Sequence, residues 1–133
     1  MIETPSADAL HPGRVLAAAG GVYDVELASG EVVPASLRGR IKQQARTGDR
    51  VVAGDVVEIA RDGSGGATIE VVEPRVSELA RRAPGRSRGA KVLVANPEQL
   101  VAVFALTHPA PNPRLLDRFL VTAEVNRLPA VVV

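Results

Sequence analysis

The chain has 133 residues, of which 46% are apolar, contains no cysteine and carries a formal net charge of +1. This length suits one domain, or a small domain with part of a second. The lack of cysteine excludes disulfides and thiolate metal sites, and the two histidines, His11 and His108, have no partner at metal-ligand spacing. Because the N-terminus has no signal-peptide pattern and no apolar run approaches about 18 residues, we expect a cytoplasmic protein without membrane contact.

The first two segments predict a short tail and a small barrel. Residues 1–12 are polar and are expected to be disordered, whereas 13–73 alternate between apolar and polar residues in short runs broken by turn residues. The expected strands are 13–19, 22–27, 31–37, 51–60 and 67–73. Five short strands in about sixty residues favour a five-stranded OB-fold barrel, with an SH3-like barrel as the alternative.

A basic segment, 38–50, interrupts this barrel and is expected to be a long loop. If the preceding strand continued into it, Arg38, Arg40 and Lys42 would project from one face, because strand side chains alternate. After the barrel, 74–91 is basic and rich in Pro, Gly and Ser, without strand or helix periodicity, so we expect a linker.

Residues 92–133 have the pattern of a βαβ unit. The apolar run 100–106 predicts a buried parallel strand, and "LPAVVV" at the end of the chain predicts a second. Between them, Asn112 is a suitable N-cap and Pro113 a suitable first residue for a helix with one apolar stripe. Because one βαβ unit leaves both faces of its strands uncovered, we expect a truncated α/β domain. That this domain is of the P-loop GTPase type is implied by the family resemblance described below.

The basic residues are concentrated in two islands, which together hold eleven of the sixteen Lys and Arg but two of the fifteen Asp and Glu. The first island contains Arg38, Arg40, Lys42, Arg46 and Arg50; the second contains Arg75, Arg81, Arg82, Arg86, Arg88 and Lys91. Such clustering favours a polyanion partner, above all a nucleic acid. The alternative for each island is an ordinary solvated loop.

The sequence offers no catalytic centre and no cofactor or metal site. Neither Lys42 nor Lys91 follows the glycine pattern of a P-loop, and no Ser, His and acid set suggests nucleophilic catalysis. The aromatic residues are Tyr23, Phe104 and Phe119, so little base stacking is available. A nucleic acid would therefore be recognised mainly through its phosphates, with a steep salt dependence.

Several blocks resemble one known family in order and spacing. They are "GRVLAAAGGVYDVEL", "GEVVPASLRGRIK", "VVAGDVVEI", "IEVVEPRVSELARR", "VANPEQLVAVFAL" and "PRLLDRFLVTAE". From about Gly13 to its end, the chain resembles the circularly permuted ribosome-assembly GTPases of the RsgA/YjeQ family. The most specific features are Leu37-Arg38-Gly39-Arg40 after a hairpin, the Gly54-Asp55 bend and Leu116-Asp117-Arg118.

The resemblance implies an N-terminal OB domain that docks on the small ribosomal subunit and its 16S-type rRNA, followed by the start of a permuted GTPase domain. A full-length relative would hydrolyse GTP during late maturation of the subunit, bind GTP, Mg²⁺ and Zn²⁺, and act as a cytoplasmic monomer. The guanine-specifying Asn-Lys-x-Asp motif would follow Val133, so the resemblance places every nucleotide and zinc ligand outside these residues. Whether this chain is an enzyme is left open.

The resulting hypothesis assigns RNA binding to both islands. Its candidate RNA-binding residues are Arg38, Arg40, Lys42, Arg46, Arg50, Arg81, Arg82, Arg86 and Arg88. The competing hypothesis is a basic OB-fold module that binds an acidic protein and no nucleic acid.

Overall fold

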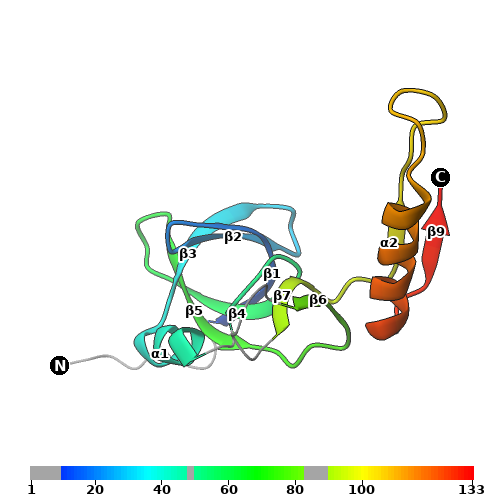
Figure 1. Cartoon of the computed structure of the whole chain (residues 1–133). Coiled ribbons are helices and arrows are strands. Elements are labelled where there is room, and N and C mark those ends of the chain that lie inside the picture. Colours follow the sequence, from blue (N-terminus) through cyan, green and yellow to red (C-terminus); the bar gives the residue numbers. More distant parts are fainter. Residues whose placement is uncertain (1–9, 48–49, 83–89) are drawn as a thin grey trace. The chain divides into compact units, whose positions relative to one another are not determined.

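The computed structural model describes residues 10–47, 50–82 and 90–133. The chain divides into two compact units, Met1–Arg75 and Val76–Val133. Each unit has its own sheet structure (Figure 1) and is described separately.

The first unit is a closed barrel of five strands, which confirms the predicted OB-type fold. The strands are β1 (Leu10–Ala19), β2 (Val22–Leu27), β3 (Val32–Leu37), β4 (Val56–Arg61) and β5 (Ala67–Val72). Their order around the barrel is β1-β2-β3-β5-β4, and Figure 1 shows the ring that they form. Strands β3 and β5 pair in parallel, whereas the other neighbours pair in antiparallel fashion.

The alternating apolar residues predicted from the sequence fill the barrel. The most completely buried are Val15, Val25, Val33, Val57, Ile59 and Ile69. Small, branched side chains suit this narrow interior, because strand side chains on one face lie close together. Gly13 lets strands β1 and β2 lie unusually close together: a Cβ at this position would lie 2.5 Å from Cγ1 of Val25 and 2.9 Å from the carbonyl oxygen of Glu26.

Strand β1 begins at Leu10, so the tail expected over 1–12 is too long by three residues. Leu10, His11 and Pro12 pair with β4, and pairing with β2 begins only at Gly13. Pro12 is tolerated because the segment before Gly13 has a partner on one side only, and proline lacks the N–H needed for pairing on both sides.

Residues expected to form a basic loop instead form helix α1 (Gly39–Thr47). The carbonyl of Arg38 accepts a hydrogen bond from the N–H of Lys42 at 2.9 Å, which closes the first turn. Ile41 is buried and belongs to the barrel core, so the helix packs on the barrel through this side chain. The sequence is compatible with a helix because Arg, Lys, Gln and Ala are strong helix formers.

The second unit begins with an antiparallel ribbon where a strand-free linker over 74–91 was expected. It consists of β6 (Glu78–Arg82) and β7 (Ala90–Ala95). The ribbon ends at Asn96, which has a positive φ of 52° and whose side-chain oxygen accepts the N–H of Val76 at 2.8 Å. A bulge between Leu79 and Ala80 breaks the regular alternation, which explains why the sequence pattern did not reveal these strands.

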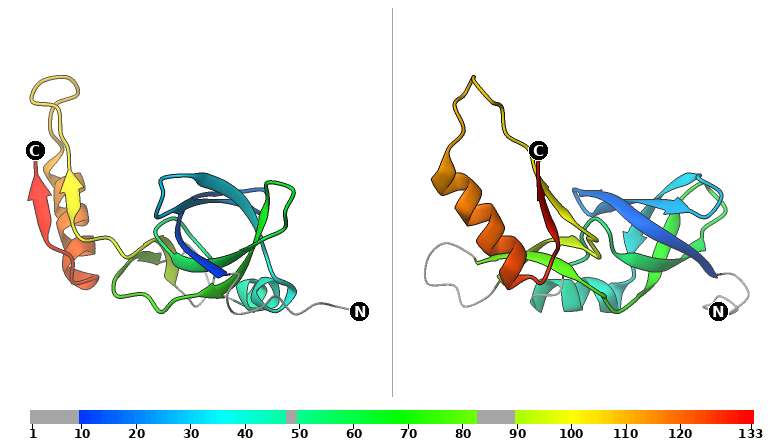
Figure 2. Two further views of the ribbon diagram at one scale, coloured as in Figure 1. Left: turned by 180° about the vertical axis from the view of Figure 1, so that it is seen from behind. Right: turned by 90° about the vertical axis from the view of Figure 1, so that its right-hand side faces the viewer.

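The predicted βαβ unit follows the ribbon. It comprises β8 (Leu100–Ala102), α2 (Pro113–Val125) and β9 (Ala130–Val132), with β8 and β9 parallel. The side chain of Asn112 accepts the N–H groups of Arg114 and Leu115, which confirms the predicted N-cap. Figure 2 shows α2 against one face of the two strands. The strand expected over 100–106 is shorter than predicted, and four of the seven side chains in that range are exposed.

Neither helix in the described part of the chain is long and apolar enough to span a membrane.

Candidate nucleic-acid interface

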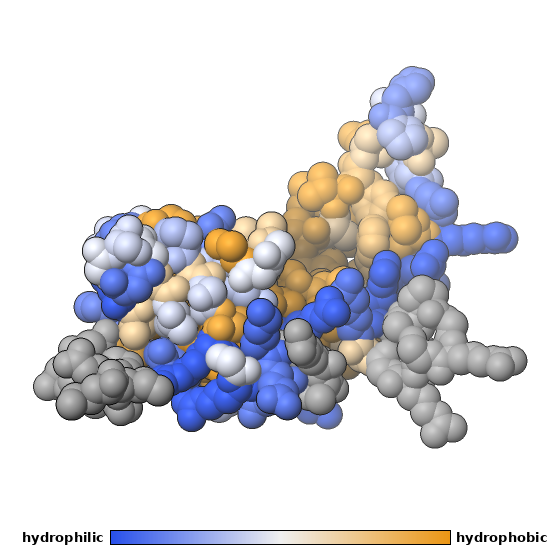
Figure 3. All heavy atoms as spheres, turned by 90° about the vertical axis from the view of Figure 1, so that its left-hand side faces the viewer, coloured by the Kyte–Doolittle hydropathy of each residue, from blue (hydrophilic) through white to orange (hydrophobic). Residues whose placement is uncertain are grey.

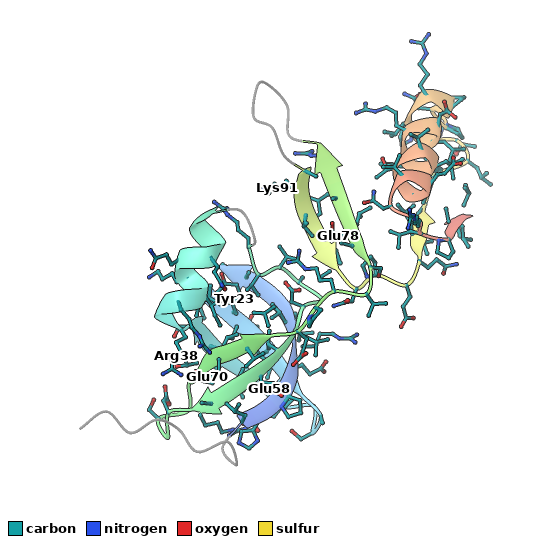
Figure 4. The ribbon with its side chains drawn as sticks, turned by 90° about the horizontal axis from the view of Figure 1, so that it is seen from below. Tyr23, Arg38, Glu58, Glu70, Glu78 and Lys91 are labelled. Carbon is teal, nitrogen blue, oxygen red and sulfur yellow. The ribbon has the colours of Figure 1, made fainter. Side chains whose placement is uncertain are left out.

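Arg38 fastens the start of α1 to the barrel. Its guanidinium forms an ion pair with Glu70 of β5, and its N–H donates to the carbonyl of Ile69 at 3.2 Å. The Glu70 side chain is 10% exposed, so the arginine compensates a largely buried carboxylate, and Figure 4 shows the two side chains together. Arg38 is 40% exposed and thus reaches the surface while remaining paired.

Arg40 and Lys42 lie on α1 and are exposed. Because they are part of a helix, residues two apart point about 200° apart around the axis, so the three cations do not share one strand face. The helix displays cations on more than one side instead. Figure 3, which faces the α1 side, shows hydrophilic residues gathered over the lower foreground of the barrel unit. Arg46 also lies in α1, but its side chain falls outside the described residues.

A buried carboxylate holds the chain that follows α1. Asp55 is completely buried; one oxygen accepts Nε of Arg75 at 2.8 Å, and the other accepts the N–H of Val52 at 2.8 Å. The Arg75 guanidinium also donates to the carbonyl of Arg50 at 2.8 Å. Arg75, the last residue of the barrel unit, therefore ties the end of that unit to the segment before β4. Although it belongs to the second basic island, its guanidinium is engaged in the structure of the barrel.

A groove of about 410 Å³ opens beside this clamp. Its lining includes Ile41 and Gln44 of α1, Arg50, and Val72 and Glu73 at the end of β5. Arg50 is exposed at its edge. The groove brings together α1 and the turn that carries Arg50, so two parts of the first island meet at one end of the barrel.

The second island lies partly on the ribbon. Arg81 is exposed on β6, and Lys91 stands opposite to it on β7. Arg82 also belongs to β6, although its side chain is outside the described part of the chain, as are Arg86 and Arg88 altogether. Lys91 belongs to this island but is not among the candidate RNA-binding residues, and its position opposite Arg81 follows from strand pairing that the sequence does not show.

The aromatic residues are used in packing. Tyr23 is half-buried and packs against the barrel core. Phe104 and Phe119 contact each other with ring centroids 6.1 Å apart, which helps to hold α2 to its sheet. Because they are used in packing, these rings do not form an exposed platform of the kind on which unpaired bases stack.

The glycine-rich segment at 62–66 is a hairpin turn between β4 and β5. Asp62 accepts the N–H of Ser64 at 2.8 Å, its hydroxyl at 2.7 Å and the N–H of Gly66 at 3.1 Å. These hydrogen bonds, above all those from Ser64, lower the pKa of Asp62 below its ordinary value because they stabilise the carboxylate. The segment has a complete structural explanation.

Comparison with known proteins identifies the family. The family model described as RsgA GTPase matches residues 72–133. The small ribosomal subunit biogenesis GTPase RsgA of Gemmatimonas aurantiaca is 46% identical over 123 residues, which cover 91% of this chain and 40% of that protein. The chain belongs to the RsgA family. The RsgA protein of Moorella thermoacetica is 40% identical over 121 residues, covering 91% of this chain and 37% of its own length.

Solved RsgA-type structures have the same fold. YjeQ from Thermotoga maritima has a TM-score of 0.69 at 29% identity, over 92% of this chain and 40% of that chain. YloQ, a circularly permuted GTPase, has a TM-score of 0.67 at 23% identity over 98% of this chain and 42% of its own, which supports the fold alone. The chain thus spans about 40% of the length of the RsgA proteins that it matches. The family match begins before β6, so it includes the ribbon.

The described residues do not fit the groups implied for longer RsgA proteins. Within residues 10–47, 50–82 and 90–133, no three His, Asp or Glu side chains cluster so as to hold a metal ion. Neither lysine follows a glycine-rich phosphate loop. No step of GTP chemistry is therefore assigned to side chains of this chain.

Two of the best-defined contacts cannot be inferred from the sequence pattern. Glu70 and Asp55 are acidic residues whose partners, Arg38 and Arg75, lie 32 and 20 positions away in the chain. The sequence gives no signal for Glu70: it directly follows the core residue Ile69, so strand alternation places it on the outer face, and its burial beside Arg38 is not visible in "TIEVV". Recognising its partner requires the parallel pairing of β3 and β5.

Proposed function

We propose that this chain docks on the small ribosomal subunit through phosphates of its 16S-type rRNA and takes part in the late maturation of that subunit. The observation that carries the proposal is a helix with exposed cations, α1, on the barrel of a chain whose relatives are named small ribosomal subunit biogenesis GTPases. Such a helix neutralises phosphates without reading base sequence. The proposed compartment is the cytoplasm, and the proposed state of the complete family member is a monomer.

Within the first island, the proposal assigns different tasks to the cations. Arg40 and Lys42 are the primary phosphate contacts, since both are exposed on α1. Arg50, which is exposed at the edge of the groove, and Arg46 are proposed as further contacts. Arg38 contributes chiefly by holding the helix to Glu70, because a guanidinium engaged with a buried carboxylate is not readily given up to an external phosphate.

The second island, including Arg81, Arg82, Arg86 and Arg88, is proposed as an additional RNA contact. GTP hydrolysis is part of the proposal only for the longer RsgA proteins, whose name includes it. No residue of this chain receives a role in that reaction.

The test is co-sedimentation with purified small ribosomal subunits over a series of salt concentrations. The double variant Arg40→Gln, Lys42→Gln is compared with the wild type and with a matched control, Arg114→Gln, Arg118→Gln, which removes two exposed cations from the other helix. If each α1 cation contacts a phosphate, the slope of log K against log salt falls by about two in the first variant and stays unchanged in the control.

Equal binding by the α1 variant and the wild type would refute the assignment to α1. Protein-free 16S-type rRNA separates the two kinds of partner: a chain that sediments with subunits but does not bind this RNA docks on ribosomal protein. That result would support the protein-interaction hypothesis instead.

A further inference from the structure

The hairpin turn between β4 and β5 contains a dipeptide with a chemistry of its own, Asp62-Gly63. No other Asp or Asn in the sequence is followed by glycine. The backbone nitrogen after an aspartate can attack the side-chain carboxyl group, and glycine, which has no Cβ, hinders this approach least. Asp62 is exposed, and at the Cβ position of Gly63 no described atom beyond the two chain neighbours lies within 4 Å. Both reacting groups are therefore unshielded.

The reaction is an isomerisation that consumes and releases only water. The nitrogen of Gly63 forms a bond to Cγ of Asp62 and loses its proton, while the carboxyl group loses one oxygen as water. Water then opens the resulting cyclic imide at either of its two carbonyl carbons. Opening at Cγ restores aspartate, whereas opening at the main-chain carbonyl carbon leaves isoaspartate, in which the chain runs through the former side chain. The atoms of reactant and product are the same.

The turn stabilises the reactant more than the imide. Oδ1 of Asp62 accepts the hydroxyl of Ser64 at 2.7 Å, the N–H of Ser64 at 2.8 Å and the N–H of Gly66 at 3.1 Å. Hydrogen bonds to a charged carboxylate are stronger than those to a neutral carbonyl, and the imide is neutral. Contacts that are stronger in the reactant than in the transition state slow a reaction.

The same contacts keep the carboxyl group in its less reactive form. The hydroxyl of Ser64, followed by its N–H, lowers the pKa of Asp62 below the ordinary value. Loss of water is easier from the protonated acid than from the carboxylate, so a lower pKa also slows the formation of the imide. Of the three donors, the hydroxyl of Ser64 is the one that a single substitution removes without changing the backbone.

We propose that Asp62-Gly63 is an isomerisation site of this protein and that the hydroxyl of Ser64 slows its conversion to isoaspartate. Conversion adds one methylene group to the main chain between β4 and β5. The hydrogen bond from the N–H of Asp62 to the carbonyl of Gly66, at 3.1 Å, closes the turn beside the pair Arg61 and Ala67 and no longer fits the longer chain. The product exposes a free main-chain carboxylate, which is the group that isoaspartyl carboxyl methyltransferases modify. The inference is independent of RNA binding.

The test follows isoaspartate in the whole chain during incubation at neutral pH and physiological temperature. An isoaspartyl methyltransferase with a labelled methyl donor measures the amount, and fragmentation mass spectrometry of proteolytic peptides locates it. The wild type is compared with Ser64→Ala, with Ser64→Thr, which keeps a hydroxyl, and with Asp62→Ser, which lacks the reacting carboxyl group. The φ of Ser64 is not positive, so alanine and threonine fit its backbone.

Loss of the hydroxyl should raise the rate of isoaspartate formation at Asp62 by about threefold to tenfold, whereas Ser64→Thr should stay within about twofold of the wild type. Asp62→Ser should give no signal at this position. Hydrogen exchange of the β4 and β5 amides is measured in parallel and should not change in Ser64→Ala. Faster exchange there, matching the faster conversion, would mean that the hydroxyl acts only by stabilising the hairpin, and its direct role would be overturned.

Three other results would contradict the proposal. Equal rates in Ser64→Ala and the wild type would remove the role assigned to the hydroxyl. If folded wild type and Ser64→Ala both form no isoaspartate while the chain in denaturant does, the folded protein has no isomerisation site here. Isoaspartate that forms as fast at Asp24, which precedes the buried Val25, would show that the Asp-Gly turn is not selective.

Discussion

The two units are stabilised in different ways. The barrel encloses a contiguous core of ten buried residues, including Ile41 of α1, and adds one fully buried carboxylate. Among its described residues, the second unit has four buried apolar side chains, Ala95, Ala102, Ala123 and Leu128, and three of these are alanines. Its backbone is held instead by side-chain amides: Asn96, Asn112 and Asn126 each bond to main-chain groups.

This contrast shows that a closed sheet and an open sheet bury their apolar side chains to different extents. In the barrel, every strand has neighbours on both sides, so inward residues are buried without help from other layers. In the second unit, two-stranded sheets bury little, and polar side chains have to specify the geometry. Hydrogen exchange read residue by residue is the appropriate measurement, because it reports the stability of each unit separately.

The largest loss is expected for Asp55→Ala. Removing the buried carboxylate takes the anionic partner from the Arg75 guanidinium, which keeps its hydrogen bond to the carbonyl of Arg50, and leaves the N–H of Val52 without its acceptor. The free energy of unfolding of the barrel should fall by about 4 kcal/mol. Amides of β1 and β4 should then exchange faster, while those of α2 keep their rates. A loss below about 1 kcal/mol would mean that water replaces the carboxylate and that the clamp is not structural.

Ile59→Ala should destabilise the barrel by about 3 kcal/mol, since it leaves a cavity in a fully buried position. The matched control is Leu120→Ala on α2, where the side chain is 37% exposed and the cost should be below about 1 kcal/mol. Chemical denaturation of both variants provides the measurement. Similar losses at the two positions would contradict the distinction between the two units.

In the second unit, Asn126→Ala should cost about 2 kcal/mol, because it removes the hydrogen bonds to Ala80 and to the carbonyl of Thr122. The Ala80 amide should lose protection first. Asn112→Ala, which removes only the N-cap, should cost about 1 kcal/mol and leave the ribbon protected. Unchanged exchange at Ala80 in the Asn126 variant would show that its amide does not hold β6.

The smallest effect concerns Asp62 and pH. Its pKa is lower in the folded protein than its ordinary value of 3.8, so the folded state favours the charged carboxylate. This contribution is fully present above the ordinary pKa and is lost as the pH falls from 3.8 through the lower folded pKa. Asp62→Asn should therefore flatten the acid limb of the stability curve slightly, as measured by thermal melting between neutral and acidic pH. A steeper acid limb would contradict the sign.

The sequence predicts the barrel well because its strands follow a period of two over several residues. It fails at α1, where Arg38, Arg40 and Lys42 also repeat every second residue and Ile41 is the only buried residue among the described side chains of the helix. One buried residue is too weak a helical pattern to separate a short helix from a basic loop. At the ribbon, the bulge between Leu79 and Ala80 conceals the alternation.

The candidate site depends on contacts that local patterns do not contain. The basic islands are visible in the sequence, but the roles within them are not. Arg38 is paired with Glu70 and Arg75 with Asp55, whereas Arg81 faces Lys91. Each of these relations is created by pairing between segments that are distant in the chain, so composition alone cannot distinguish a structural arginine from one available to RNA.

The closure of the barrel has a consequence for how fast the protein folds. Two strand pairings, here called seams, join segments that are distant in the chain. Strand β1 pairs with β4, for example Leu10 with Ala60, and β3 pairs with β5, with α1 and β4 lying between them in the sequence. The hairpins β1–β2 and β2–β3 form from neighbouring residues, but these two seams require long loops to close first. Barrel folding should therefore be limited by the seams, and the Asp55–Arg75 clamp, which lies beside one of them, should affect the unfolding rate more than the folding rate.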